Sequence, residues 1–121
     1  MDKNIFGETL KLCCSSPKTG YFRDGYCRTS KEDYGKHTVC AIVTKEFLEF
    51  SKSKGNDLTT PNNKYLFPGL KPGDKWCLCA LRWKEAFEAG CAPKVDLEST
   101  SEKALKYVNI EDLIKHAYKS K

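Results

Sequence analysis

Two short apolar runs, at residues 37–43 and 75–80, most constrain how this chain can fold. Each has the length and composition of a buried strand, and each leads into a segment with helical spacing. Thr44 is a favourable N-cap for a helix over 45–53, which Gly55 ends. The pattern therefore predicts two strand–helix pairs joined by a long polar connection.

Shorter elements are expected around these pairs. They are an edge strand at 4–12, a tight hairpin turn at Asp24-Gly25, a helix through Trp83 and Phe87, a short strand at 95–97, and two helices capped by Ser101 and Asn109. Helices and strands are mixed without a regular βαβ rhythm. We expect an α+β fold: a small mixed sheet of short strands with three to four helices, in one compact domain over residues 1–121.

The apolar content bounds the class of protein. The chain has 121 residues and is 40% hydrophobic, which is enough for one core. Its longest apolar run, about residues 76–81, is far shorter than the roughly 20 residues of a membrane span. The first residues lack the apolar stretch of a signal peptide. We therefore expect a cytoplasmic protein with no membrane partner.

The charge balance is moderately basic. Lys and Arg number 21 against 16 Asp and Glu, for a net charge of +5. Only three of these cations are arginines, and no run of five like charges occurs. This pattern disfavours nucleic acid as a partner. A weak RNA- or polyanion-binding module stays open as an alternative.

Seven cysteines make the chain cysteine-rich, and their number is odd. With no export signal, we expect reduced thiols that are buried, metal-ligating or reactive. In a strand Cys77 and Cys79 point to one face, yet their C-x-C spacing differs from that of zinc knuckles. The candidate ligands for a thiolate-bound metal such as zinc are Cys27, Cys40, Cys77, Cys79 and His37.

A catalytic role is the third possibility for the cysteines, beside burial and metal binding. The candidate catalytic residues are His37, Cys40 and Asp57. Cys and His together can form a nucleophile and its base. Because positions three apart in a strand face opposite sides, His37 and Cys40 should not bond directly, and we expect His37 to pair with a residue from another element.

Polar and aromatic residues near the loops are the candidate binding residues: Arg23, Asp24, Asn56, Asp57, Asp74, Trp76 and Arg82. Asp24 and Asn56 also have turn or helix-exit roles. Asp57 and Asp74 have no comparably firm structural reason. Trp76 and Trp83, with aromatics near Tyr65 and Phe67, could form a face for a partner.

Several segments together resemble a known family. They are 19–25, 37–41, 47–51, 55–58 and, most specific of all, 67–80, followed by Arg82-Trp83, Glu85-Ala86 and Gly90. Over nearly its whole length the chain resembles a bacterial-type family of unknown function, DUF2237. The resemblance implies a small standalone α+β protein with Cys13, Cys27, Cys40, Cys77 and Cys79 inside family motifs. After the 95–98 segment the family usually has Thr-His, whereas Thr100 here precedes Ser101.

These observations favour an uncharacterised binding or interaction domain without catalysis, with self-association possible. The alternatives are a thiol- or metal-dependent protein or enzyme that uses a cysteine cluster with His37, and the polyanion-binding module. The sequence names neither a substrate nor a partner.

Overall fold

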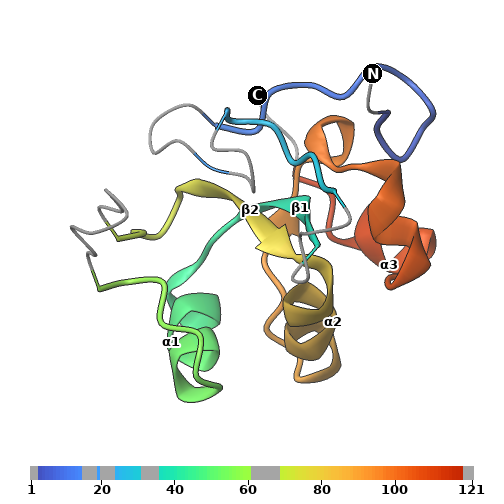
Figure 1. The fold of residues 1–121 in the computed structure, drawn as a ribbon. Helices are drawn as coiled ribbons and strands as arrows, with labels where there is room; N and C mark the ends of the chain where they lie inside the picture. Colours follow the sequence, from blue (N-terminus) through green and yellow to red (C-terminus); the bar gives the residue numbers. More distant parts are fainter. Residues whose placement is uncertain (1–2, 15–18, 20–23, 31–35, 61–68, 119–121) are drawn as a thin grey trace.

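The structure is a computed structural model that describes residues 3–14, 19, 24–30, 36–60 and 69–118. In chain order the elements are β1 (His37–Ile42), α1 (Lys45–Ser53), β2 (Lys75–Cys79), α2 (Ala80–Glu88), β3 (Lys94–Val95), the 3₁₀ helices η2 (Leu97–Ser99) and η3 (Glu102–Lys106), and α3 (Ile110–Lys115). A small sheet with separate helices confirms the predicted α+β class (Figure 1).

The sheet is built around β1, with strand order β2-β1-β3 and antiparallel pairing on both sides. Cys40 of β1 lies directly opposite Cys77 of β2. The register then shifts between His37 and Val39, so that His37 lies opposite Cys79. This β-bulge decides which side chain meets the end of β2.

The two faces of the sheet carry different side chains. Val39 and Leu78 belong to the main apolar core, in which Phe47 of α1 and Trp83 of α2 are fully buried. The alternate positions, Cys40 and Cys77, belong to a separate buried cysteine cluster. In Figure 1 the helices α1 and α2 lie on one side of β1 and β2, and the N-terminal segment, drawn in blue, lies on the other.

Three predicted helix caps are confirmed. The Thr44 hydroxyl accepts the Phe47 N–H at 3.1 Å, and α1 has the predicted bounds. Ser101 and Asn109 cap η3 and α3 by accepting N–H groups two residues ahead. The Ser101 that stands where the resembling family has histidine therefore starts a helix.

The chain around the predicted edge strand and the final helix differs from expectation. Residues 4–12 form only isolated bridges, among them Asn4 with Ser101, because buried Asn4 turns the chain by accepting the N–H groups of Phe6 and Glu8.

The last helix is shorter than expected. The apolar stripe through Tyr118 predicts a longer last helix, yet α3 ends at Lys115. Beyond it, the Tyr118 N–H donates to the Val95 carbonyl at 2.7 Å, so hydrogen bonding to β3 replaces the helical pattern.

The Asp24-Gly25 turn is described only in part, since 20–23 lie outside the described residues. Gly25 has φ 87°, and a Cβ there would stand 2.8 Å from the Cys14 carbonyl oxygen. Only glycine fits this close approach. None of the helices in the described part is long and apolar enough to cross a membrane.

Candidate functional site

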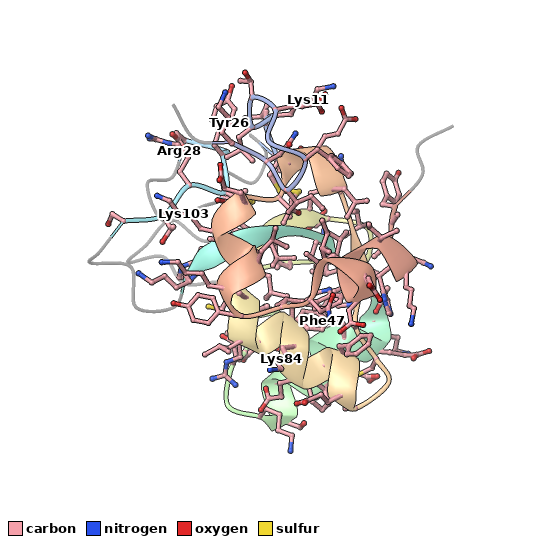
Figure 2. The ribbon with its side chains drawn as sticks, turned by 90° about the vertical axis from the view of Figure 1, so that its right-hand side faces the viewer. Lys11, Tyr26, Arg28, Phe47, Lys84 and Lys103 are labelled. Atoms are coloured by element: carbon pink, nitrogen blue, oxygen red, sulfur yellow. A yellow bond between two sulfur atoms is a disulfide. The ribbon has the colours of Figure 1, made fainter. Side chains whose placement is uncertain are left out.

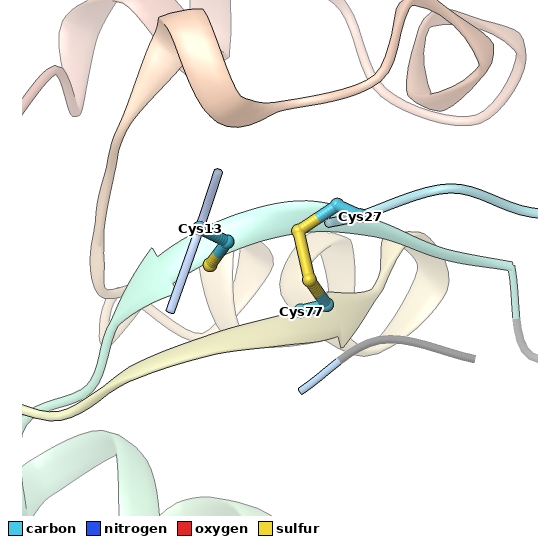
Figure 3. A group of neighbouring side chains, drawn as sticks. All are labelled: Cys13, Cys27 and Cys77. Carbon is cyan, nitrogen blue, oxygen red and sulfur yellow. A yellow bond between two sulfur atoms is a disulfide. The ribbon is translucent and has the colours of Figure 1, made fainter. Parts of the chain in front are cut away.

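Four cysteines gather on the sheet face opposite the main core. Cys13 is joined to Cys40 and Cys27 to Cys77 by disulfides, with Cα–Cα distances of 5.8 and 5.2 Å. None of the four is more than 5% exposed. Figure 3 shows the bridge from Cys27 to Cys77 on β2, with Cys13 beside it. Two neighbouring strand positions are thereby tied to two separate points of the N-terminal segment.

Hydrogen bonds from neighbouring segments hold the same two strand positions. The backbone N–H of Cys77 donates to the Thr19 hydroxyl at 2.7 Å, and that of Cys40 donates to the Thr100 hydroxyl at 3.1 Å. Because these four cysteines form disulfides, the expectation of reduced thiols is wrong for them in this structure. An odd total does not prevent pairing, since Cys14, Cys79 and Cys91 lie outside the two disulfides. Paired cysteines of this kind are typical of oxidising compartments.

The predicted metal ligands divide between two places. The sulfurs of Cys27 and Cys77 lie within 4.8 Å of each other and of Cys13, and Cys40 is bonded to Cys13. Cys79 and His37 are not in this group. Since the thiolate is the form that binds metal, the cysteine cluster offers ligands only after its disulfides are reduced. Cys13 is absent from the predicted ligands, although the family resemblance placed it within a motif.

His37 meets Cys79, a pairing that the sequence did not identify. The imidazole Nε2 lies 3.4 Å from the Cys79 sulfur, and both side chains are partly exposed. Cys40 does not pair with His37, as expected, because Cys40 is buried in a disulfide and the bulge sets His37 opposite Cys79. His37 does pair with another element, as expected. The bulge itself has no signal in the hydropathy pattern.

Cys79 also begins a helix. It is the last residue of β2 and the N-cap of α2, where its side chain makes no capping hydrogen bond. The first turn of α2 contains no acidic residue. Because helix N-termini carry a partial positive charge, the Cys79 sulfur lies at the positive end of the α2 dipole. A thiol, an imidazole and a helix N-terminus are thus combined at one partly exposed point.

Cys91 provides a contrast to Cys79. It is a free and partly exposed thiol that follows the end of α2. Burial raises the pKa of the Cys91 thiol, and the negative charge of Glu46 raises it further. The two thiols are therefore both partly exposed but lie in different electrostatic surroundings.

The predicted polar binding residues make hydrogen bonds within their own turns, and their binding role stays a prediction. Asp57 accepts four hydrogen bonds from Thr59 and Thr60, and these donors hold the pKa of its carboxyl well below its usual range. Asp74 accepts the Lys71 N–H in the turn before β2. Both acids thus have turn-forming roles that the sequence analysis did not assign.

The remaining predicted binding residues are likewise accounted for within their own surroundings. Asp24 pairs with Arg28, Asn56 binds Ser51 through its backbone, and Arg82 donates to the Lys54 carbonyl. Trp76 is only 7% exposed and Trp83 is fully buried, so neither offers the expected aromatic face. Arg23, Tyr65 and Phe67 lie outside the described residues.

Comparison with known proteins identifies a family and no activity. A family model described as an uncharacterized protein conserved in bacteria (DUF2237) matches residues 3–117. None of the curated proteins matches the chain. Neither comparison assigns an activity to the His37–Cys79 pair.

Proposed function

The chain belongs to this family of uncharacterized bacterial proteins, and we propose that it is a thiol-dependent protein in which Cys79 is the nucleophile and His37 its base. The supporting observation is the 3.4 Å separation between the Cys79 sulfur and Nε2 of His37. Activated cysteines are paired with a base or placed at a helix N-terminus. Cys79 meets both conditions.

The proposed first step is a proton transfer followed by nucleophilic attack. Nε2 of His37 accepts the thiol proton of Cys79, and the sulfur forms a bond to an electrophilic atom of the substrate. The leaving group departs from that atom with its bonding electron pair. The start of α2 stabilises the negative charge on the sulfur before attack.

Alkylation of the folded protein by iodoacetamide tests this proposal. The cysteine sulfur forms a bond to the reagent's methylene carbon, and iodide leaves with the electrons of the broken C–I bond. Without added reductant, Cys14, Cys79 and Cys91 are the cysteines outside disulfides among the described residues. We expect Cys79 to react faster than Cys91 near pH 7, because a raised pKa leaves little Cys91 thiolate. Peptide mapping by mass spectrometry gives each rate.

A pair of histidine variants supplies the matched control. His37→Gln should slow alkylation of Cys79 about tenfold or more, since positioned bases contribute at least that much. His116→Gln changes the other histidine, which lies against Trp83 and Phe87, and should leave the Cys79 rate unchanged. Equal rates at Cys79 and Cys91, or a His37→Gln protein that reacts like the parent, would overturn the proposal.

The second candidate is the binding domain without catalysis that the sequence favoured. It is supported by a pocket of about 300 Å³ whose described lining is residues 29, 30, 36, 103, 106 and 107. Lys36, which lines this pocket, directly precedes His37, and its carbonyl accepts the N–H of Ala80, the residue after Cys79. The pocket and the thiol pair are therefore neighbours.

Two finer predictions accompany these candidates. A cytoplasmic location stays a prediction, and the two disulfides weigh against it. Self-association also stays a prediction, which light scattering at several protein concentrations would test. A mass that rises with concentration would support it, and a constant monomer mass would count against it.

A further inference from the structure

A cationic pocket lies between the segment after Cys27 and η3. It has a volume of about 300 Å³ and is lined by Thr29, Ser30, Lys36, Lys103, Lys106 and Tyr107. Its lining contains three ammonium groups and three hydroxyl groups, and no carboxylate among the described residues. Figure 2 shows Lys103 on the helix beside the segment that carries Arg28. The chemistry of this lining is that of an anion site.

Lys36 has an unusual backbone conformation. Its φ is 50°, and it is the one non-glycine residue in the described part with a positive φ. Such a conformation costs about 1 kcal/mol or more and is often held in place at functional sites. Here the Lys36 carbonyl accepts the N–H groups of Thr38 and Ala80, at 2.7 and 3.1 Å. These bonds fix the backbone from which the side chain extends.

The Lys36 side chain contacts another residue of the pocket lining. Its Nζ donates to the Ser30 carbonyl at 3.0 Å, and this acceptor carries no net charge. Lys103 and Lys106 lie three residues apart on η3, and positions i and i+3 of a 3₁₀ helix share a face. Among the described residues, no carboxylate forms a salt bridge with any of these lysines. A bound anion would relieve the repulsion between these cations.

We propose that this pocket binds a small molecule that carries a phosphate monoester. Lysine ammonium groups bind phosphate as point charges, and the hydroxyl of Tyr107 in the lining can donate to its oxygens. A volume near 300 Å³ is at the small end of ligand pockets and leaves room beyond a phosphate group alone. The inference rests on the binding role of the pocket and does not require the thiol chemistry of Cys79.

Titration of the ¹⁵N-labelled protein with ribose 5-phosphate, followed by NMR, tests the site. We expect saturable shifts at the backbone amides of Lys36, Lys103 and Tyr107, with weaker binding of inorganic phosphate and none of ribose. Removing both η3 ammonium groups with Lys103→Ala and Lys106→Ala should weaken binding at least tenfold, since each charged hydrogen bond contributes about 1.5 kcal/mol or more. Lys52→Ala on α1 removes one exposed lysine charge elsewhere and should change little.

Each other result has a defined meaning. Absence of saturable shifts with both phosphate compounds overturns the inference. Equal binding of ribose and ribose 5-phosphate also overturns it, while leaving a binding role for the pocket. Tight binding of a single-stranded RNA with none of ribose 5-phosphate overturns it in favour of a polyanion surface. If Lys52→Ala weakens binding as much as the η3 changes do, the attraction comes from net charge and the site is rejected.

Discussion

The Cys79 thiol and the His37 imidazole face each other at 3.4 Å because the bulge at the start of β1 sets His37 opposite Cys79. The same bend places Lys36 next to α2, since its carbonyl accepts the Ala80 N–H. One short stretch of backbone therefore positions both the proposed base and a wall of the cationic pocket. Thiol reactivity and anion attraction should then be measurable at the same cysteine.

The charge of the alkylating reagent should affect the rate at Cys79. Iodoacetate is an anion and iodoacetamide is neutral, and both transfer their carbon to sulfur with loss of iodide. We expect the iodoacetate-to-iodoacetamide rate ratio to be several-fold higher at Cys79 than at Cys91, where the charge of Glu46 acts on the thiol. The excess of this ratio at Cys79 should decline as salt is added, because the distance over which charges interact falls to about 10 Å at 0.1 M salt. A ratio equal at both cysteines and insensitive to salt would contradict this prediction.

Replacing Lys36 with glycine should separate stability from binding. Glycine adopts a φ of 50° without strain, which offsets its entropic cost and the lost bond to Ser30. We expect Lys36→Gly to change the free energy of unfolding by less than about 1 kcal/mol, as most surface changes do. Denaturant titration measures this value.

Phosphate binding should respond differently to the same substitution. Loss of the Lys36 ammonium should weaken ribose 5-phosphate binding about tenfold, the effect of one charged hydrogen bond. Lys36→Arg keeps the charge and is the matched control for this measurement. A Lys36→Gly protein that unfolds readily, or that binds ribose 5-phosphate as the parent does, would show that Lys36 serves the fold alone.

The parts of the fold that the sequence predicted are local. Thr44, Ser101 and Asn109 cap helices through hydrogen bonds to N–H groups two or three residues ahead, so neighbouring residues suffice to recognise them. The alternation around Cys40 and Cys77 likewise separates the two faces of the sheet. Strand alternation has a period of two residues, which a sequence displays directly.

The candidate site depends on distant contacts that leave no such period. The His37–Cys79 contact spans 42 residues and requires a bulge, which shifts one residue against the partner strand. The disulfides join residues 27 and 50 positions apart, and seven cysteines permit many pairings. Neither the pairing nor the bulge follows from composition. The sequence placed His37 and Cys79 in one larger set of candidate ligands but did not single them out as a pair.

The carboxyl of Asp57 should titrate at strongly acidic pH. Hydrogen bonds from Thr59 and Thr60 favour its ionised form and hold its pKa well below the usual range. Because the pKa is lower in the folded chain than in the unfolded chain, the stabilisation is complete above the ordinary aspartate value of about 4. It is lost only as the pH falls through the folded pKa. The ¹³C shift of the Asp57 carboxyl reports this titration.

A threonine variant checks the cause of this behaviour. Thr60→Val removes the hydroxyl donor that lies 2.6 Å from the Asp57 carboxylate and should raise the pKa toward the ordinary value. Thr29→Val, a similar change away from this turn, should leave the Asp57 titration unchanged. If Asp57 in the parent protein already titrates like an aspartate in an unstructured peptide, the four hydrogen bonds do not form in solution.

Loss of either disulfide should destabilise the fold substantially. The bridges close loops of 27 and 50 residues, for which chain entropy predicts about 4 kcal/mol of stability each. We expect the Cys13→Ala/Cys40→Ala and Cys27→Ala/Cys77→Ala proteins each to lose an amount of that order in denaturant unfolding. Cys91→Ala, which removes a free thiol, should have a much smaller effect.

The intact mass decides whether the four sulfurs are paired in the protein as purified. Formation of two disulfides removes four hydrogens, so the non-reduced mass should lie about 4 Da below that of the reduced chain. Seven alkylatable thiols after denaturation without reductant would contradict the pairing. If such a reduced protein then held one zinc ion per chain, and lost it on Cys27→Ala/Cys77→Ala substitution, the cysteine cluster would be the thiolate metal centre that the sequence left open.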